Sequence, residues 1–249
     1  LYKETKFSHL YINNTYDPEI DAIDNSINKE FGSLFKINAY NSSLLFNPNE
    51  ILNNAGSFFK VYTPFWKNAL NKLNLREPLP LPNIKYVYKK DILSLKNIAI
   101  SDVDEKWGKK ILSYFNPGEV SAREMLGKTS TNIKGYSEGR DFPIKNNTSQ
   151  LSPYIARGEL SVNEIFYLMR KNKKKININD YAKFTSQLGW REFSYNILYN
   201  FPKLPRKNFI SKFDNFPWSK NSKLLNLWKK GLTGYPIVDA GMRELRTTG

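Results

Sequence analysis

The spacing of apolar residues changes along the chain, and this change constrains the fold more than any other feature of the sequence. From residue 1 to about residue 65, short strand-like runs at 9–12 and 34–37 flank one helical stretch at 20–31. Within that stretch Ile20, Ile23, Ile27 and Phe31 recur at the spacing of one helix face. A strand, a helix and a second strand in this order predict a β-α-β unit.

A proline-spaced segment follows this unit. The run PLPLP at 78–82 and the turn signal NPG at 116–118 interrupt any regular pattern. We therefore interpret residues 66–117 as an interdomain linker between an α/β domain at 1–65 and a further domain at 118–249.

Helical patterns dominate after residue 118. Ser161 and Glu164 form a capping box that opens a helix, and two more helices are expected at about 180–199 and 235–246. The expected fold is thus α/β followed by all-α.

Composition narrows the chemistry. With no cysteine and a single histidine, His9, we expect neither disulfides nor a metal site. The formal net charge of +15 favours a polyanionic partner such as nucleic acid. The alternative is that abundant lysine reflects only a solvated surface. No apolar run reaches the roughly 18 residues that span a bilayer, so we expect a soluble protein. The absence of cysteine permits a reducing compartment, and we expect a cytoplasmic location and a monomer.

The run TSQLSP at 148–153 concentrates hydroxyl groups before a helix start. Serine as the N-cap and proline at the first helical position are both favourable, so we expect Ser152 to cap a helix. Free amides of the first turn, together with the hydroxyls of Thr148, Ser149 and Ser152, would suit a phosphate. The alternative is that the hydroxyls cap only the helix itself.

One face of the helix expected at 180–199 carries an unusual mixture. Helical spacing gathers Phe184, Gln187, Trp190 and Arg191 within one arc. Arginine can bind phosphate in a bidentate manner and tryptophan can stack on a base. The arc is either a ligand wall or a buried structural network. Gly189, unfavourable by about 1 kcal/mol inside a helix, indicates that something packs closely there.

Four blocks in this order resemble the flavin domain of the photolyase/cryptochrome family: TSQLSPYIARGELS at 148–161, QLGWREFS at 187–194, FPW at 216–218 and TGYPIVDAGMREL at 233–245. More loosely, YINNTYDP at 11–18, LLF at 44–46 and VYTPFW at 61–66 resemble the later part of that family's antenna domain. The resemblance extends over essentially the whole chain. It implies an incomplete Rossmann-like antenna domain followed by the first part of a helical FAD-binding domain, with further sequence expected at both ends.

The resemblance also implies roles for individual residues. The loop that would hold the FAD pyrophosphate comprises Thr148, Ser149, Gln150, Leu151 and Ser152. Tyr136 would reach the same phosphates, and Phe184, Gln187 and Arg191 would line the flavin cavity. Gln187 and Trp190 would meet a flipped pyrimidine dimer, and Arg140 would contact DNA. Trp218 would be the outermost tryptophan of the electron-transfer chain.

The activity implied is light-driven repair of cyclobutane pyrimidine dimers by an electron from excited reduced FAD, assisted by a second antenna chromophore, folate or deazaflavin. Gln187 stands where many cyclobutane-repairing relatives carry glutamate, which leaves (6-4) lesions open as the substrate. Gln150 stands where the family often has arginine or lysine, which removes one charge from the phosphate loop. The alternative within the family is a cryptochrome, a blue-light receptor without repair activity. A basic nucleic-acid-binding module without a cofactor is a third reading.

Overall fold

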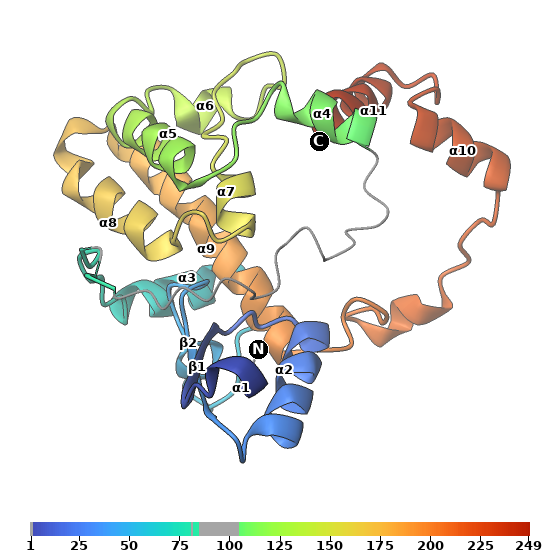
Figure 1. Ribbon diagram of the computed structural model, residues 1–249. Helices are drawn as coiled ribbons and strands as arrows, with labels where there is room; N and C mark the ends of the chain where they lie inside the picture. Colours follow the sequence, from blue (N-terminus) through green and yellow to red (C-terminus); the bar gives the residue numbers. More distant parts are fainter. Residues whose placement is uncertain (1, 81, 85–104) are drawn as a thin grey trace. The chain divides into compact units, whose positions relative to one another are not determined.

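The computed structural model describes residues 2–80, 82–84 and 105–249 (Figure 1). The chain divides into two compact units, one comprising 1–86 with 118–209 and the other 87–117 with 210–249. Each unit is described by itself below. The described part is mostly helical and contains a small parallel sheet.

The first unit begins with the expected β-α-β unit. Strands β1 (His9–Asn13) and β2 (Lys36–Tyr40) pair in parallel, with His9 opposite Lys36 and Asn13 opposite Tyr40. Helix α2 (Pro18–Phe31) connects them and starts two residues before the predicted position. It starts there because Asp17 accepts hydrogen bonds from the amides of Glu19 and Ile20, and Pro18 occupies the first turn. A short helix α1 (Tyr2–Thr5) precedes β1.

The apolar face of α2 is more exposed than its spacing predicts. Ile20, Ile23 and Phe31 are exposed, and no residue of α2 is buried. Two strands lie only about 4.8 Å apart, whereas a helix with its side chains is about 10 Å wide. A two-stranded sheet is therefore too narrow to bury a whole helix face.

Helix α3 (Tyr62–Asn71) continues past residue 66, where we placed the start of the linker. Its Phe65 and Ala69 are buried with Phe46 and Ile51, and Trp66 and Phe193 pack against this cluster. The first part of the interpreted linker is thus a helix in the core of the first unit. Residues 81 and 85–104 of that range lie outside the described residues, and the domain boundaries stay predictions.

The remaining elements of the first unit are the 3-10 turns η1 (Pro48–Glu50) and η3 (Lys173–Lys175) and the helices α5 (Glu119–Thr131), α6 (Tyr136–Gly139), α7 (Ser152–Ala156), α8 (Val162–Lys171) and α9 (Ile178–Asn200). Ser161 caps α8 as predicted, since its hydroxyl accepts from the amides of Asn163 and Glu164. The carboxylate of Glu164 lies 3.8 Å from Arg123 of α5, so it links two helices rather than completing the box.

Helix α9 is the longest element and organises the first unit. It contacts α6, α8 and α3 and, near its end, the turn η1 (Figure 1). Gly189 lies where α9 meets α3, and a Cβ atom built on it would be 2.6 Å from Cδ2 of Trp66. The close packing that Gly189 indicated is therefore contact with a tryptophan ring of the same chain.

We expect Gly189→Ala to destabilise the protein although alanine favours helices. The added methyl group must displace the Trp66 ring, and such overpacking costs about 2 kcal/mol. Gly127→Ala is a matched control inside α5, because nothing lies within 4 Å of the point where its Cβ atom would be placed. That change should stabilise by about 0.5–1 kcal/mol. Chemical denaturation of both variants measures the difference, and equal stabilisation of the two would contradict the packing explanation.

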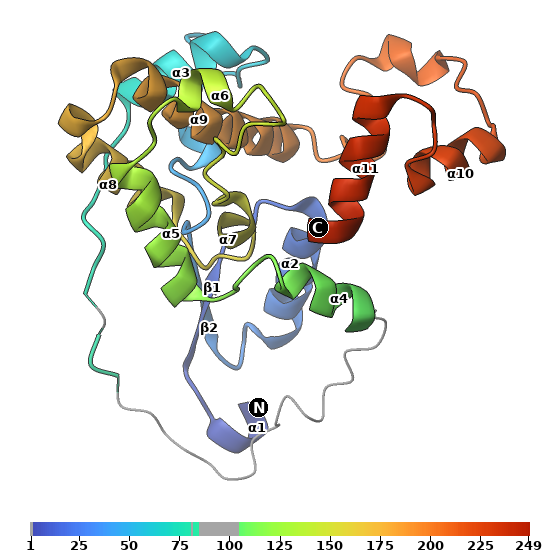
Figure 2. The same cartoon turned by 90° about the horizontal axis from the view of Figure 1, so that it is seen from above.

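The second unit contains α4 (Glu105–Leu112), the 3-10 turn η4 (Ser211–Asn215), α10 (Ser222–Lys230) and α11 (Pro236–Thr248). Helix α11 contacts both α4 and α10 (Figure 2). Nε1 of Trp107 on α4 donates to the carbonyl of Arg246 at 3.2 Å. Asp239 fixes the start of α11 by accepting from the amides of Thr233 and Gly234 and from the Thr233 hydroxyl.

Candidate functional site

The start of α6 is fixed to α9 by a buried carboxylate. Asp180, only 4% exposed, accepts hydrogen bonds from the amides of Gly135 at 2.9 Å and Ser137 at 2.7 Å. Burial alone would raise the pKa of Asp180. The hydrogen bonds from Ser137 and Gly135 outweigh burial, and the pKa lies below its ordinary value. Asp180 is therefore a charged anchor that positions α6.

Two of the residues singled out by the resemblance lie at α6: Tyr136 is its first residue and Arg140 is its C-cap. The buried ring of Tyr136 packs edge-on against Phe184 of α9, with ring centroids 5.5 Å apart. Nη1 of Arg140 donates to the Tyr136 hydroxyl at 3.0 Å. Asp141 lies 3.3 Å from Arg140 and 3.6 Å from Lys183 of α9. Three predicted site residues, Tyr136, Arg140 and Phe184, thus lie together at the junction of α6 and α9.

The hydroxyl-rich loop is attached to the same junction through Asn147. The side-chain amide of Asn147 donates to the Gly135 carbonyl at 3.3 Å. Asn147 also packs closely on Gly139, where an added Cβ atom would lie 2.4 Å from Cγ of Asn147. Gln150 follows with a φ of 53°, a left-handed conformation that non-glycine residues rarely adopt. This conformation lies just before α7, with one residue between.

Our prediction that Ser152 caps α7 is wrong by one residue. The N-cap is Leu151, which is in the right-handed helical region, and Ser152 is the first helical residue. The left-handed Gln150 directly precedes this cap. The hydroxyl of Ser149 accepts from the Leu151 amide at 3.5 Å. The hydroxyls of Thr148 and Ser152 are exposed and have no hydrogen-bond partner within the described residues.

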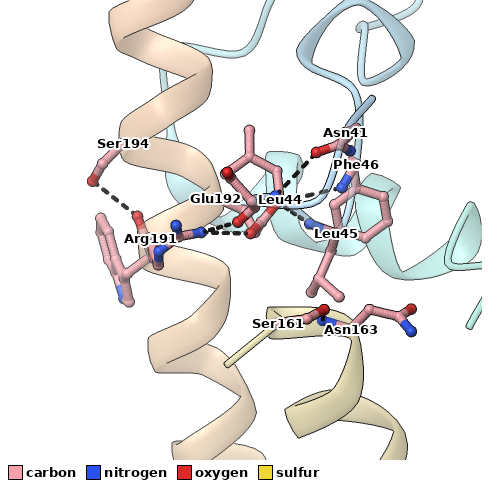
Figure 3. Close-up of polar contacts among 11 residues, drawn as sticks. Asn41, Leu44, Leu45, Phe46, Ser161, Asn163, Arg191, Glu192 and Ser194 are labelled. Carbon is pink, nitrogen blue, oxygen red and sulfur yellow. Dashed lines mark hydrogen bonds and ion pairs between the residues drawn. The ribbon is translucent and has the colours of Figure 1, made fainter. Parts of the chain in front are cut away.

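Arg191 and Glu192 of α9 hold the segment at 43–46 (Figure 3). Nη1 of Arg191 donates to the Ser43 carbonyl at 2.7 Å and lies 3.4 Å from Oε1 of Glu192. Oε2 of Glu192 accepts from the amides of Leu45 at 2.9 Å and Phe46 at 3.4 Å. The guanidinium of Arg191 therefore already binds the chain itself, which the expected flavin role did not anticipate.

Farther along α9, Asn196 and Tyr199 make polar contacts with the residues that follow the segment at 43–46. Asn196 donates to the Pro48 carbonyl at 3.3 Å, and Asn49 donates to the Tyr199 hydroxyl at 2.9 Å. Side chains of α9 thus bind backbone groups of the segment at 43–48 at four points. Burial raises the pKa of Glu192 to about 8, against the opposing effects of Arg191 and the two amides.

The neighbouring face of α9 presents Trp190 and Gln187. Trp190 is 46% exposed, and its ring stacks on Tyr62 of α3 with centroids 3.8 Å apart. The side chain of Gln187 is partly exposed and makes no hydrogen bond with the part of the chain that the structure describes. Both side chains are available for contact with a ligand.

Trp218 belongs to the second unit and is 75% exposed, with its ring 4.7 Å from that of Phe216. Its electron-transfer role therefore stays a prediction.

Sequence reasoning missed Tyr62, Asp180 and Glu192. Tyr62 and Glu192 lie inside blocks that carried the family resemblance, VYTPFW and QLGWREFS, but no local pattern identified their partners. Asp180 had a weaker signal, an acidic residue in the first turn of a predicted helix.

Two family models match the chain. Residues 1–83 match the model described as DNA photolyase, and residues 184–249 match the FAD binding domain of DNA photolyase. The combination of a parallel β-α-β unit with a helical FAD-binding region defines the photolyase/cryptochrome fold. The chain belongs to the DNA photolyase/cryptochrome family.

Known relatives agree with this assignment. The deoxyribodipyrimidine photo-lyase of Agrobacterium fabrum is 34% identical over 98% of this chain and 52% of its own length. Cryptochrome-2 of Arabidopsis thaliana is 28% identical over 98% of this chain and 42% of its own length. The crystal structure of a bacterial class III photolyase from Agrobacterium tumefaciens superimposes with a TM-score of 0.86 at 33% identity, covering 100% of this chain and 52% of that one.

The chain spans about half the length of the photo-lyase relatives that it matches. Among the described residues, no helix is both long and apolar enough to cross a membrane.

Proposed function

We propose that this chain is part of a deoxyribodipyrimidine photo-lyase, an enzyme that splits cyclobutane pyrimidine dimers in DNA under light. The observation that carries the proposal is the face of α9, where the exposed Trp190 lies one helical turn from Gln187, whose amide no described residue binds. A flat ring beside an amide suits a pyrimidine that is stacked on one side and hydrogen-bonded at its edge. The photo-lyase relatives support the same activity.

The loop at 148–152 fits the phosphates of FAD. Thr148 and Ser152 offer hydroxyl donors that are unpaired within the described chain, and Gln150 between them has a left-handed φ. Because α7 has only five residues, its dipole contributes little and the hydroxyls supply most of the binding. Bound FAD would supply the photoexcited electron.

Other residues of the chain would orient the cofactor. Tyr136 and Phe184 form an aromatic wall at the α6–α9 junction. Both hydrogen bonds of Arg191 use Nη1, and the described residues leave its Nε and Nη2 without a hydrogen-bond partner, although the guanidinium lies over the Tyr195 ring. Arg191 therefore can bind both the segment at 43–46 and an anionic ligand. Trp218 would relay electrons from the surface.

DNA binding would use the positive charge of the chain. Arg140 contributes a guanidinium held by Tyr136 and Asp141. A damaged pyrimidine pairs and stacks poorly, so flipping it out costs less than flipping a normal base. Within this proposal the protein acts as a monomer, its β-α-β unit is the later part of a Rossmann-like antenna domain, and that domain holds folate or deazaflavin.

The test uses the purified protein that carries this chain and an oligonucleotide with one cyclobutane thymine dimer. We expect the dimer to disappear under blue light and to persist in darkness, as measured by chromatography of the oligonucleotide. Binding to this DNA should weaken steeply with salt. Photoreduction of the flavin without loss of dimers would identify a cryptochrome-type receptor, and a colourless protein would contradict both assignments.

A further inference from the structure

One face of Trp190 is covered by a side chain from a distant part of the sequence. Tyr62 of α3 stacks on it with ring centroids 3.8 Å apart and an angle of 8° between the ring planes. Tyr62 lies in the region matched to the DNA photolyase model, whereas Trp190 lies in the region matched to the FAD-binding domain. The stack therefore joins the two matched regions at the proposed lesion site.

The other face of Trp190 is open. Phe193 is the second ring that contacts Trp190, with ring centroids 5.9 Å apart and 77° between the ring planes. Its centroid is also 5.9 Å from that of Tyr62, with 74° between the planes. If Phe193 lay over the outer face of Trp190, Trp190 would stand between it and Tyr62. Its ring centroid would then be nearly 3.8 Å farther from Tyr62 than from Trp190. Phe193 must instead lie beside the stacked pair. Among the described residues no other ring contacts Trp190, and 46% of this residue is exposed.

The Tyr62 ring is itself fixed in place. Its hydroxyl lies 2.9 Å from both the carbonyl and the hydroxyl oxygen of Ser186, one turn before Trp190 on α9. Phe65 and Ala69, on the same helix, are buried in the core. Helix α3 thus presents Tyr62 from a rigid support, and the plane of Trp190 is set before any ligand arrives.

We propose that Tyr62 is a positioning residue that makes Trp190 a one-sided stacking platform for a flipped pyrimidine lesion. This inference rests on the proposed function and names a residue outside the flavin domain that completes its lesion site. Without Tyr62 the indole can rotate about its side-chain bonds, and part of the stacking free energy is spent on ordering it. The effect should fall on damaged DNA alone, because undamaged duplex places no base at the platform.

The experiment compares binding of dimer-containing and undamaged DNA by the protein that carries this chain. For Tyr62→Leu we expect about a tenfold loss of affinity for damaged DNA, which is within the range that one base-stacking contact contributes. Affinity for undamaged DNA should change less than about twofold. Tyr62→Phe keeps the stack and loses only the Ser186 hydrogen bonds, so it should retain most of the preference for damage.

A double-mutant cycle tests whether Tyr62 acts through Trp190. In a Trp190→Leu background, Tyr62→Leu should cause no further loss, since no ring remains to be positioned. Near-ultraviolet circular dichroism should lose the signal of the stacked pair in Tyr62→Leu and keep it in Tyr62→Phe. Tyr199→Leu is the matched control: its hydroxyl bonds Asn49, and it lies about 13 Å along α9 from Trp190. Damage recognition should be unchanged in that variant.

Two results would overturn the inference separately from the function. In the first, wild type and Tyr62→Leu prefer damaged DNA equally. This result would contradict the positioning role of Tyr62 and leave the proposed function standing. Additive losses in the double-mutant cycle would show that Tyr62 acts independently of Trp190. A wild-type protein with no preference for damaged DNA overturns both proposals.

Discussion

Glu192→Ala should lower the free energy of unfolding by about 3–5 kcal/mol, the larger end of single-residue effects. Glu192 is buried and accepts from the amides of Leu45 and Phe46, while Arg191 lies against its second oxygen. Alanine would leave two amide donors unpaired and a cavity where the carboxyl group was. Urea denaturation followed by fluorescence measures the loss.

Glu192→Gln is the informative companion because it keeps an acceptor for the two amides. Burial raises the pKa of Glu192 from 4.5 to about 8, so the folded state binds the proton more tightly than the unfolded chain. The stabilisation from this proton is complete below pH 4.5 and is lost as the pH rises through about 8. Wild type should therefore lose on the order of 5 kcal/mol across this window relative to Glu192→Gln. Parallel pH profiles of the two proteins would contradict a raised pKa.

Local sequence patterns predicted the elements whose formation depends on residues close together in the sequence. The strand run at 9–12, the helix α8 with its Ser161 cap, and the long helix α9 all follow from apolar spacing and capping residues within one window. The second strand run, predicted at 34–37, is displaced: β2 is Lys36–Tyr40, and residues 34 and 35 belong to the turn that precedes it. The family blocks then gave candidate residues, and the structure brings Tyr136, Arg140 and Phe184 together as a group.

Two features that local patterns missed depend on partners far away in the sequence. Gly189 suggested a close contact, but nothing near it identified Trp66. In the sequence Glu192 looks like an ordinary charged residue on a helix surface. Its partners, the amides of Leu45 and Phe46, lie about 147 residues away. The misplaced cap of α7 has a different cause: a glutamine in the left-handed conformation leaves no signature, because such turns are expected at glycine or asparagine.

The second large effect is expected at Asp180. Asp180→Ala removes the acceptor for the Gly135 and Ser137 amides, and two partly buried donors left unpaired cost about 2–4 kcal/mol. Because α6 would lose its anchor to α9, Tyr136 and Arg140 should become mobile, and the proposed flavin site should weaken with them. We expect faster hydrogen exchange at residues 135–137 and loss of flavin during gel filtration.

Asp17→Ala separates this effect from simple loss of a cap. Asp17 also accepts from two backbone amides, but at the exposed start of α2, so its loss should cost about 1 kcal/mol and leave flavin content unchanged. The pH dependence gives a further check. The pKa of Asp180 is lowered, so its stabilisation is present at neutral pH and is lost as the pH falls below 3.8, opposite in direction to Glu192. If Asp180→Ala kept its flavin while unfolding more easily, α6 would be structural only, and the phosphate contacts would have to come from the hydroxyl-rich loop alone.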